Sequence, residues 1–368
     1  MERIVLFYPH IPKDAPLKVA ATLRTRWIGQ GPKVDQFERY FSKSLANNSP
    51  CIAVGSGTDA LHLAYILAGI KPGDEVITPV FTCTATNIPL LYLDAKIKFA
   101  DIDIDTLNIN VNHVKELISD KTKAIVCVHY GGLPCDMDRL IKLSNQYGIP
   151  IIQDSAHAIG AKYKGQTLTD LTDFSCYSFQ AIKSITTGDG GMLVLKDKEL
   201  SKMAKRMRWF GIDREKKQKG IWENDIRDIG YKYQMTDIAA TIGLCGLESF
   251  DRHFSYRRKL FNYYKNKLTG IPGIRFVDND DEKYCHAAWL VTVLVENRVG
   301  LKRKLEENNI ESARVHYRND RYTIFSKFKK NNLENMNYID EKYLVLPLHV
   351  KINTNDIDRI IDVIKSGW

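Results

Sequence analysis

Four short loops of this sequence carry polar residues whose types and spacing could do chemistry together. The first, GSGTDA at 55–60, leads from a predicted strand into a predicted helix. Its glycines would let a phosphate approach the backbone, and a helix N-terminus offers free N–H groups and a favourable dipole. A tight turn with a capping residue would have the same sequence, so this loop by itself does not identify a phosphate site.

The second loop, IIQDSAH at 151–157, places a carboxylate at the end of an apolar predicted strand. A pyridine cofactor withdraws electrons well only while its ring nitrogen is protonated, and an Asp partner such as Asp154 secures that state. His157 could then pack on the face of the ring. Taken alone, Asp154 would more simply be a helix cap or part of a surface turn, and His157 a hydrogen-bonded core residue.

The third loop contains Lys183, between SFQAI at 178–182 and TTGDGG at 186–191. A lysine that forms a Schiff base needs a depressed pKa to act as a nucleophile and proton carrier. Lys183 follows a predicted strand and lies among small and hydroxyl residues, and Ser178 could donate to a phosphate. A solvent-exposed lysine is the ordinary alternative.

The fourth loop, HYGG at 129–132, follows another apolar strand and could line the same cleft. It has no companion ligands at useful spacing, so we predict no metal site. The four loops together favour a cleft for a phosphorylated pyridine cofactor, although none of them is specific alone.

The elements that must position these loops alternate between β-rich and amphipathic segments from about residue 50 to 200, which predicts a mostly parallel α/β sheet with helices on both faces. Ligands in such sheets bind beyond the carboxyl ends of the strands, where all four loops lie. The first predicted strand ends with CIAV at 51–54, and the others cover 75–80, 96–103, 122–130, 149–154, 174–179 and 192–197. Helices are predicted at 59–70, 87–95, 111–119 and 137–148.

The pattern changes toward the C-terminus. Residues 201–250 are predicted to be largely helical, and the chain from about 255 has an α+β pattern with helices near 256–268 and 357–367 and a strand near 288–295. We therefore expect a large domain over 1–250, whose N-terminal segment packs on the other domain, and a small C-terminal α+β domain over 251–368.

Composition narrows the class of protein. Hydrophobic residues make up 44% of the 368 residues, as in soluble globular proteins, and no signal peptide or membrane span is predicted. The seven cysteines are dispersed, which indicates reduced thiols and a cytoplasmic location. The net charge is +9, and much of this excess lies in 202–219, which contains eight Lys or Arg against two acids. Without an aromatic-interleaved ribbon, this stretch favours a solvated helical face, or a role near an anionic substrate, over nucleic acid.

Taken in order, these motifs resemble those of the DegT/DnrJ/EryC1/StrS sugar aminotransferases over nearly the whole chain. The shared motifs are SGT at 56–58, Asp154-x-x-His157, and Ser178-Phe179-x-x-x-Lys183 before GDGG at 188–191. Segments in the family's order also include WIGQGP at 27–32, TP at 78–79, DID at 101–103, GYKY at 230–233 and LPLH at 346–349.

The resemblance implies a fold-type-I pyridoxal-phosphate (PLP) enzyme, a homodimer with its active sites at the subunit interface. It implies Lys183 as the lysine that carries PLP as a Schiff base, Asp154 as the partner of the pyridine nitrogen and His157 against the ring. Ser178, Gly57, Thr58 and Asp59 fall where the family holds the phosphate. A C-terminal segment that the family brings near the active site contains Arg314, His316 and Tyr317, which are the expected substrate residues.

Three positions depart from the family's pattern. Cys83 stands where an aromatic residue often stacks on the cofactor, so stacking would depend more on His157, or the pocket would be roomier. Lys232 stands where an asparagine usually reaches the partner subunit's phosphate, and a lysine could act there as a point charge. Asp59 replaces a common alanine, and its charge would oppose the phosphate unless the side chain turns away.

The implied reaction moves an amino group from glutamate, leaving 2-oxoglutarate, to a nucleotide-linked keto sugar, with a 4-keto-6-deoxyhexose as the default. Lys183 would move protons as general base and acid. A 3-keto sugar is the main alternative substrate. The same fold would also suit a sugar dehydratase, although relatives of that type have histidine in place of the lysine. Two further alternatives share the fold: a fold-type-I enzyme acting on amino acids, which the full-length sugar-family motifs oppose, and a non-catalytic regulatory protein, although no motif looks disabled.

Overall fold

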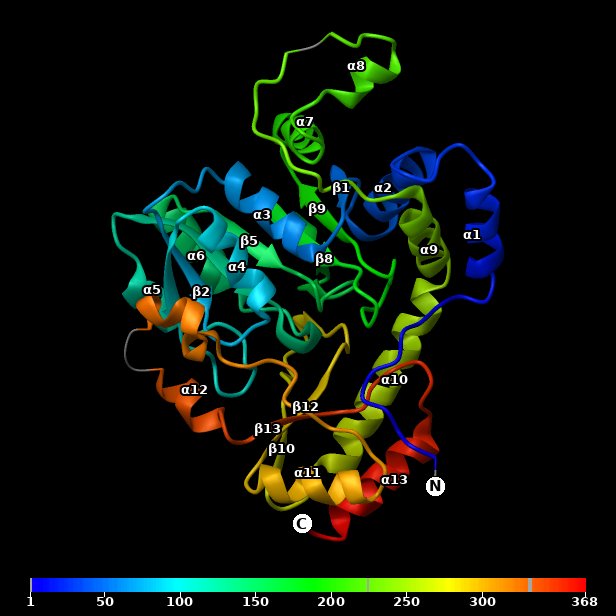
Figure 1. Ribbon diagram of the computed structural model, residues 1–368. Helices are drawn as coiled ribbons and strands as arrows, with labels where there is room; N and C mark the ends of the chain where they lie inside the picture. The colour runs from blue at the N-terminus through cyan, green and yellow to red at the C-terminus, as the bar shows by residue number, and fades with distance from the viewer. Residues whose placement is uncertain (1, 224, 330–332) are drawn as a thin grey trace.

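The computed structural model describes residues 2–223, 225–329 and 333–368. Its centre is a seven-stranded sheet in the order β1-β9-β8-β5-β4-β2-β3 (Figure 1). The strands from β8 to β3 pair in parallel, whereas β9 runs antiparallel to both β1 and β8. The strands are β1 (Cys51–Val54), β2 (Glu75–Pro79), β3 (Lys96–Ala100), β4 (Thr122–Val128), β5 (Ile151–Asp154), β8 (Phe174–Ser178) and β9 (Gly191–Leu195).

Most helices of this part bury one apolar face, either against the sheet or against a neighbouring helix. In α6, for example, the Asp136 side chain accepts the N–H of Arg139 at the start, and Gly148 ends the helix with φ of 65°. Between these caps Met137, Leu140 and Leu143 are buried. The helices of this part are α1 (Ala15–Leu23), α2 (Pro32–Leu45), α3 (Gly57–Leu67), α4 (Thr84–Tyr92), α5 (Val111–Leu117), α6 (Met137–Tyr147), α7 (Lys198–Met207), α8 (Arg214–Gln218) and α9 (Asp237–Glu248).

The long helix α10 (Phe250–Leu268) leads away from the large sheet to a second, antiparallel sheet in the order β10-β12-β13 (Figure 1). Three helices accompany this sheet in the C-terminal part, and the N-terminal segment joins this part where Ile4 bridges Ile310. The 3-10 segment η4 (Thr323–Phe328) instead contacts β3 of the large sheet. The elements are β10 (Ile274–Phe276), β12 (Val291–Val295), β13 (Tyr343–Leu346), α11 (Arg298–Glu307), α12 (Glu334–Ile339) and α13 (Thr354–Lys365). A third small sheet contains β6 (Lys162–Tyr163), β7 (Gln166–Thr167) and β11 (Tyr284–Cys285).

The predicted α/β fold with a mostly parallel sheet is confirmed. The expectation of a largely helical 201–250 is only partly right, because described residues between α8 and α9 are not helical. Gly220 follows the C-cap of α8 in a left-handed conformation with φ of 84°, and Gly211 adopts φ of 76° in the turn between α7 and α8. The chain then doubles back, so that Lys232 bridges Trp209. In Figure 1 this segment with α7 and α8 projects from the sheet at the end opposite α11 and α13.

The largest hydrophobic core is shared between the two sheets. Its buried residues include Ile152 and Phe174 of the large sheet together with Trp289 and Tyr343, which belong to the C-terminal part. A second cluster lies among α10, α11, α13 and the small sheet. Among the described residues, no helix is both long enough and apolar enough to cross a bilayer.

Candidate active site

The carboxyl ends of the parallel strands bring the predicted residues to one edge of the sheet. Asp154 is the last residue of β5 and Ser178 the last of β8, and these two strands are neighbours. The loop after β8 returns as β9, with the Phe179 N–H donating to the Gly190 carbonyl and Gln180 bridging Gly188. Lys183 lies inside this closed loop, and its ammonium group is close enough to Asp154 for each charge to shift the pKa of the other.

Asp154 is a buried carboxylate that receives two donors. Its Oδ1 accepts the N–H of Ala156 at 3.1 Å, and its Oδ2 accepts the hydroxyl of Thr86 at 2.7 Å. Burial raises the pKa of Asp154, while these two hydrogen bonds and the charge of Lys183 lower it. A carboxylate offers about four lone-pair directions, so Asp154 retains acceptor capacity for a protonated ring nitrogen.

Lys183 has the depressed pKa that its predicted role requires. Burial lowers the pKa of its ammonium to about 8, against the raising effects of Asp154 and Cys83. Its Nζ lies 3.7 Å from the centroid of the Trp289 ring, and the Trp289 Nε1–H donates to the Ile182 carbonyl at 3.3 Å. Trp289 therefore holds both the side chain of Lys183 and the loop that carries it.

The imidazole of His157 stacks on Trp289, with ring centroids 3.8 Å apart and planes inclined by 16°. His316 lies parallel to His157 at 5.1 Å. Burial and the nearby Lys183 charge lower the pKa of both histidines, that of His316 to about 3. Both rings are thus neutral at pH 7, which suits stacking beside a cationic heterocycle.

The first turn of α3 lies against Ser178, the last residue of β8. The Ser56 hydroxyl caps α3 by accepting the N–H of Asp59 at 3.0 Å. A Cβ on Gly57 would come within 2.9 Å of the Ser178 Cβ, so glycine is needed for this approach. The N–H groups of Gly57 and Thr58 belong to the first turn, where helical amides have no intrahelical acceptor.

The Asp59 carboxyl group turns back toward Gly55, which is the orientation expected if a phosphate binds at the start of α3. Burial raises the pKa of its carboxyl to about 6, and hydrogen bonds with the Ser56 hydroxyl and the backbone of Ser56 and Gly55 limit the rise. Its Oδ2 lies only 2.8 Å from where a Cβ on Gly55 would be, so the carboxyl group folds back on its own turn.

The two other departures from the family pattern lie at exposed positions. Cys83 is exposed and precedes the first residue of α4. Lys232 is exposed, with its Nζ 5.4 Å from the Phe210 ring centroid. Lys232 lies on the segment that doubles back past Trp209, and an interaction with a second subunit stays a prediction.

The C-terminal segment contributes unequally. His316 is buried beside His157, whereas Arg314 pairs with Asp340 and its guanidinium lies 4.8 Å from the Tyr343 ring centroid. Tyr317 is half-buried, with its ring 5.4 Å from that of Tyr322. The structure thus brings His316 to the predicted site and engages Arg314 in an ion pair within its own part of the chain.

His129 does not line the cleft as the sequence suggested. Its Nε2 pairs with Gln153 at 2.8 Å and its Nδ1 accepts the Cys135 N–H at 3.0 Å, so it is a hydrogen-bonded core residue. Tyr130 is the member of that loop that approaches the site, 6.4 Å from His157 between ring centroids.

Sequence reasoning missed Trp289 and Thr86. Trp289 lies in an apolar run that predicts a strand, and nothing in that run signals a contact with Lys183. Thr86 lies close to the TP at 78–79, and a buried hydroxyl partner for Asp154 has no local sequence signal. Both contacts join residues more than 60 positions apart.

Residues of the site fit a phosphorylated pyridine cofactor. Besides the acceptor capacity of Asp154, two buried ring nitrogens, His157 Nδ1 and His316 Nε2, have no hydrogen-bond partner among the described residues. Buried polar atoms are rarely left unpaired unless a ligand or water reaches them. Lys183, a neutral stacking ring and a glycine-lined helix N-terminus lie around the same edge of the sheet.

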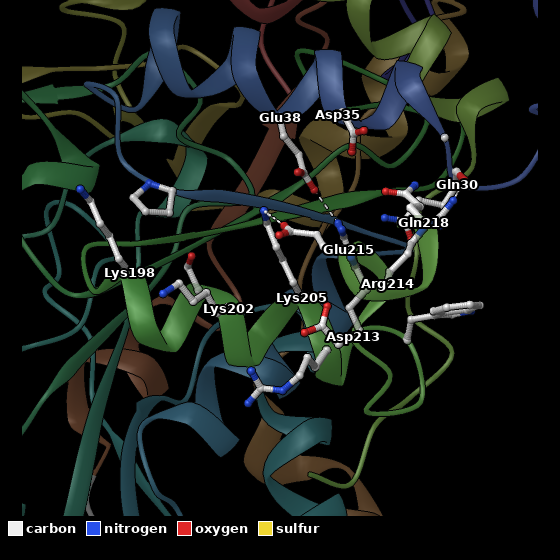
Figure 2. Close-up of a pocket in the computed structure, with 16 residues that line it drawn as sticks. Gln30, Asp35, Glu38, Lys198, Lys202, Lys205, Asp213, Arg214, Glu215 and Gln218 are labelled. Atoms are coloured by element: carbon white, nitrogen blue, oxygen red, sulfur yellow. Dashed lines mark hydrogen bonds and ion pairs between the residues drawn. The ribbon is translucent and has the colours of Figure 1, made fainter. Parts of the chain in front are cut away.

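The basic stretch 202–219 contributes to a different cavity, of about 430 Å³, between α2 and α7 (Figure 2). Figure 2 shows Lys198, Lys202 and Lys205 of α7 opposite Asp35 and Glu38 of α2. Glu38 forms a buried ion pair with Arg208, and Lys205 pairs with Glu215 at 3.3 Å. Much of the positive charge is therefore balanced locally, which favours the structural interpretation of this stretch.

The fold defines a transferase of PLP fold type I. Residues 9–365 match the DegT/DnrJ/EryC1/StrS aminotransferase family, and the chain belongs to that family. It is 32% identical to the UDP-4-amino-4-deoxy-L-arabinose–oxoglutarate aminotransferase of Shewanella sediminis over 99% of this chain and 98% of that protein. The predicted resemblance is confirmed, and the chain is a sugar aminotransferase.

Solved structures agree with this assignment. AtS13 from Actinomadura melliaura superimposes with a TM-score of 0.94 at 32% identity, covering 100% of both chains. The PLP form of the putative sugar aminotransferase Spr1654 from Streptococcus pneumoniae has a TM-score of 0.92 at 28% identity, covering 99% of this chain and 98% of that one.

Proposed function

We propose that this enzyme transfers an amino group from glutamate to a nucleotide-linked 4-keto-6-deoxyhexose, with PLP held by Lys183 and Asp154. The observation that carries the proposal is that a lysine of lowered pKa and a buried carboxylate with remaining acceptor capacity lie at one edge of the sheet. A relative whose name includes a 4-amino-4-deoxy sugar and oxoglutarate supports the choice of sugar position and donor.

When bound, PLP supplies an electron sink that stabilises negative charge on the carbon next to the transferred nitrogen. Asp154 would accept a hydrogen bond from the protonated ring nitrogen and so favour its protonated state. His157 would lie against the ring. The first-turn amides of α3 and the Ser178 hydroxyl would hold the phosphate, with the helix dipole favouring its charge.

Lys183 moves the proton. With its pKa near 8, about a tenth of the side chain is an uncharged amine at pH 7, so it can both accept and return a proton. The Trp289 ring lies against its Nζ and limits water access, which slows exchange of the transferred proton with solvent. His316 and Tyr317 are the proposed contacts to the sugar, with Arg314 a further candidate.

We also propose that the working form is a homodimer in the cytoplasm, divided into domains over 1–250 and 251–368. Seven free cysteines suit a reducing compartment. Exposed Lys232, on the segment that projects with α8, is the proposed contact to a partner subunit's phosphate.

A panel of nucleotide-linked 4-keto and 3-keto sugars, incubated with PLP and glutamate, tests the function. Amination read by mass is expected with a 4-keto-6-deoxyhexose and is expected to disappear in Lys183→Ala. Transfer to a 3-keto sugar would correct the position of amination. No uptake of PLP by the wild-type protein would overturn the proposal.

A further inference from the structure

A chain of buried hydroxyl groups that the proposed function leaves unused ends on Asp154. The Thr86 hydroxyl lies 2.7 Å from Asp154 Oδ2 and 2.8 Å from the Thr82 hydroxyl. Thr86 is fully buried and Thr82 is 2% exposed. Solvent therefore has little access to replace either hydroxyl as a hydrogen-bond partner.

The direction of these hydrogen bonds follows from the number of protons. An ionised carboxylate only accepts, so Thr86 donates its single hydroxyl proton to Asp154. Thr86 must then accept from Thr82, which donates its own proton. The hydroxyl chain therefore directs two protons in sequence toward the ionised carboxylate.

Backbone hydrogen bonds hold the main chain of Thr86 in place. The Thr86 N–H donates to the Cys83 carbonyl at 3.1 Å, and the Thr86 carbonyl accepts the hydroxyl of fully buried Tyr65 at 2.7 Å. Thr86 thus has its backbone amide, its carbonyl and its side chain all engaged within the first turn of α4.

The other end of the chain is fastened to the C-terminal part of the molecule. The Asn319 Nδ2 donates to the Thr82 carbonyl at 2.8 Å, and the Asn319 N–H donates to the Val80 carbonyl at 2.8 Å. Asn319 also accepts from the Asn87 side chain at 2.8 Å and is fully buried. The turn that carries Thr82 is therefore held from both sides.

We propose that Thr86 is a positioning residue, whose hydroxyl fixes the Asp154 carboxylate in the orientation that presents its free lone pairs to the cofactor's ring nitrogen. The inference rests on the proposed function. Thr86 itself does not touch the reacting atoms. Without its hydroxyl, the Asp154 carboxylate keeps one donor, the Ala156 N–H, and is free to rotate about its side-chain bonds.

The variants Thr86→Val and Thr86→Ser separate the hydroxyl from the shape of the side chain. A hydrogen bond to a charged group typically accounts for about a tenfold effect or more, so Thr86→Val should weaken PLP affinity about tenfold. The pH midpoint of the bound cofactor's visible band should shift by about half a unit or more, because a less firmly oriented Asp154 carboxylate stabilises the protonated ring nitrogen less well. Thr86→Ser should restore both values close to those of wild type.

Thr241→Val is the matched control. The Thr241 hydroxyl forms a buried pair with that of Thr22 at 2.9 Å, between α9 and α1 rather than beside Asp154. This variant should lower thermal stability by a similar amount and leave PLP affinity and the pH midpoint unchanged.

Wild-type PLP affinity and an unchanged pH midpoint in a folded Thr86→Val protein would overturn the inference. If Thr86→Val does not fold, Thr82→Val provides the test, because it removes only the hydroxyl that donates to Thr86. This variant should weaken PLP affinity about threefold, the size expected for a neutral hydrogen bond further from the carboxylate. No change in that variant would equally overturn it. A wild-type protein that binds no PLP would instead contradict the proposed function.

Discussion

At the scale of the residue, burial shifts the pKa values of several side chains around the site. It lowers the pKa of Lys183 to about 8 and that of His316 to about 3, and raises that of Asp59 to about 6. In each case the charged form loses hydration that the protein only partly replaces. The site therefore combines a partly neutral amine with neutral rings near pH 7.

The pKa of Lys183 predicts how the protein freed of cofactor takes PLP up. Only the uncharged amine attacks a carbonyl, so the initial rate of uptake should rise with pH and level off with a midpoint near 8. Stopped-flow absorbance from pH 6 to 10 measures this. An ordinary lysine would give a midpoint about two units higher, near 10.4. Lys183→Arg, which keeps the charge, should show no such uptake.

At the scale of the element, the site depends on how closely the ends of β1 and β8 approach the start of β9. Gly191 opens β9 and pairs with Val54 on one side and Ser178 on the other. A Cβ there would lie 2.2 Å from the Ser56 carbonyl oxygen and 2.7 Å from the Gly57 nitrogen. The turn before α3 can thus occupy its place only because residue 191 has no side chain.

Gly191→Ala should push this turn outward and weaken both folding and phosphate binding. Overpacking of a fitted interior typically costs about 1–3 kcal/mol, and the displaced α3 amides should also weaken PLP binding. Denaturant unfolding and titration with PLP measure the two effects. Gly29→Ala is the matched control, because no described atom lies within 4 Å of its Cβ position and its φ is not left-handed. Equal behaviour of the two variants would show that the close approach is unimportant.

At the scale of the whole molecule, the C-terminal part completes a site that the large sheet only begins. Trp289 and His316 both come from beyond α10 and stack with His157. Their segment is anchored by Arg318, which forms a bidentate pair with Asp320 at 2.7 and 2.8 Å and bridges Phe81 through its backbone. Both members of this pair are almost fully buried.

Arg318→Met should therefore destabilise the protein strongly. Removing one partner of a buried ion pair leaves an uncompensated charge and typically costs about 3–5 kcal/mol. Arg227→Met provides the contrast, since Arg227 pairs with Asp225 on the surface with its side chain 80% exposed, and such pairs contribute about 0–1 kcal/mol. Free energies of unfolding at one fixed protein concentration should differ between the two variants, and similar values would contradict the anchoring role.

The sequence by itself determined the family, the alternation of strands and helices, and the group formed by Lys183, Asp154 and Ser178. These features depend on local periodicity and on residue types at strand ends, and parallel strands necessarily bring their carboxyl ends to one edge. The prediction of a largely helical 201–250 failed between α8 and α9, where the left-handed Gly220 follows α8 and the described residues before α9 are not helical.

Only the tertiary structure decided which distant side chains complete the site. It placed Trp289 on Lys183, Thr86 on Asp154 and His316 beside His157, and it turned His129 into the core. It also paired Arg314 with Asp340. Such contacts join segments far apart in the chain, and they depend on how whole elements pack and bury their charges, which no local pattern of residues records.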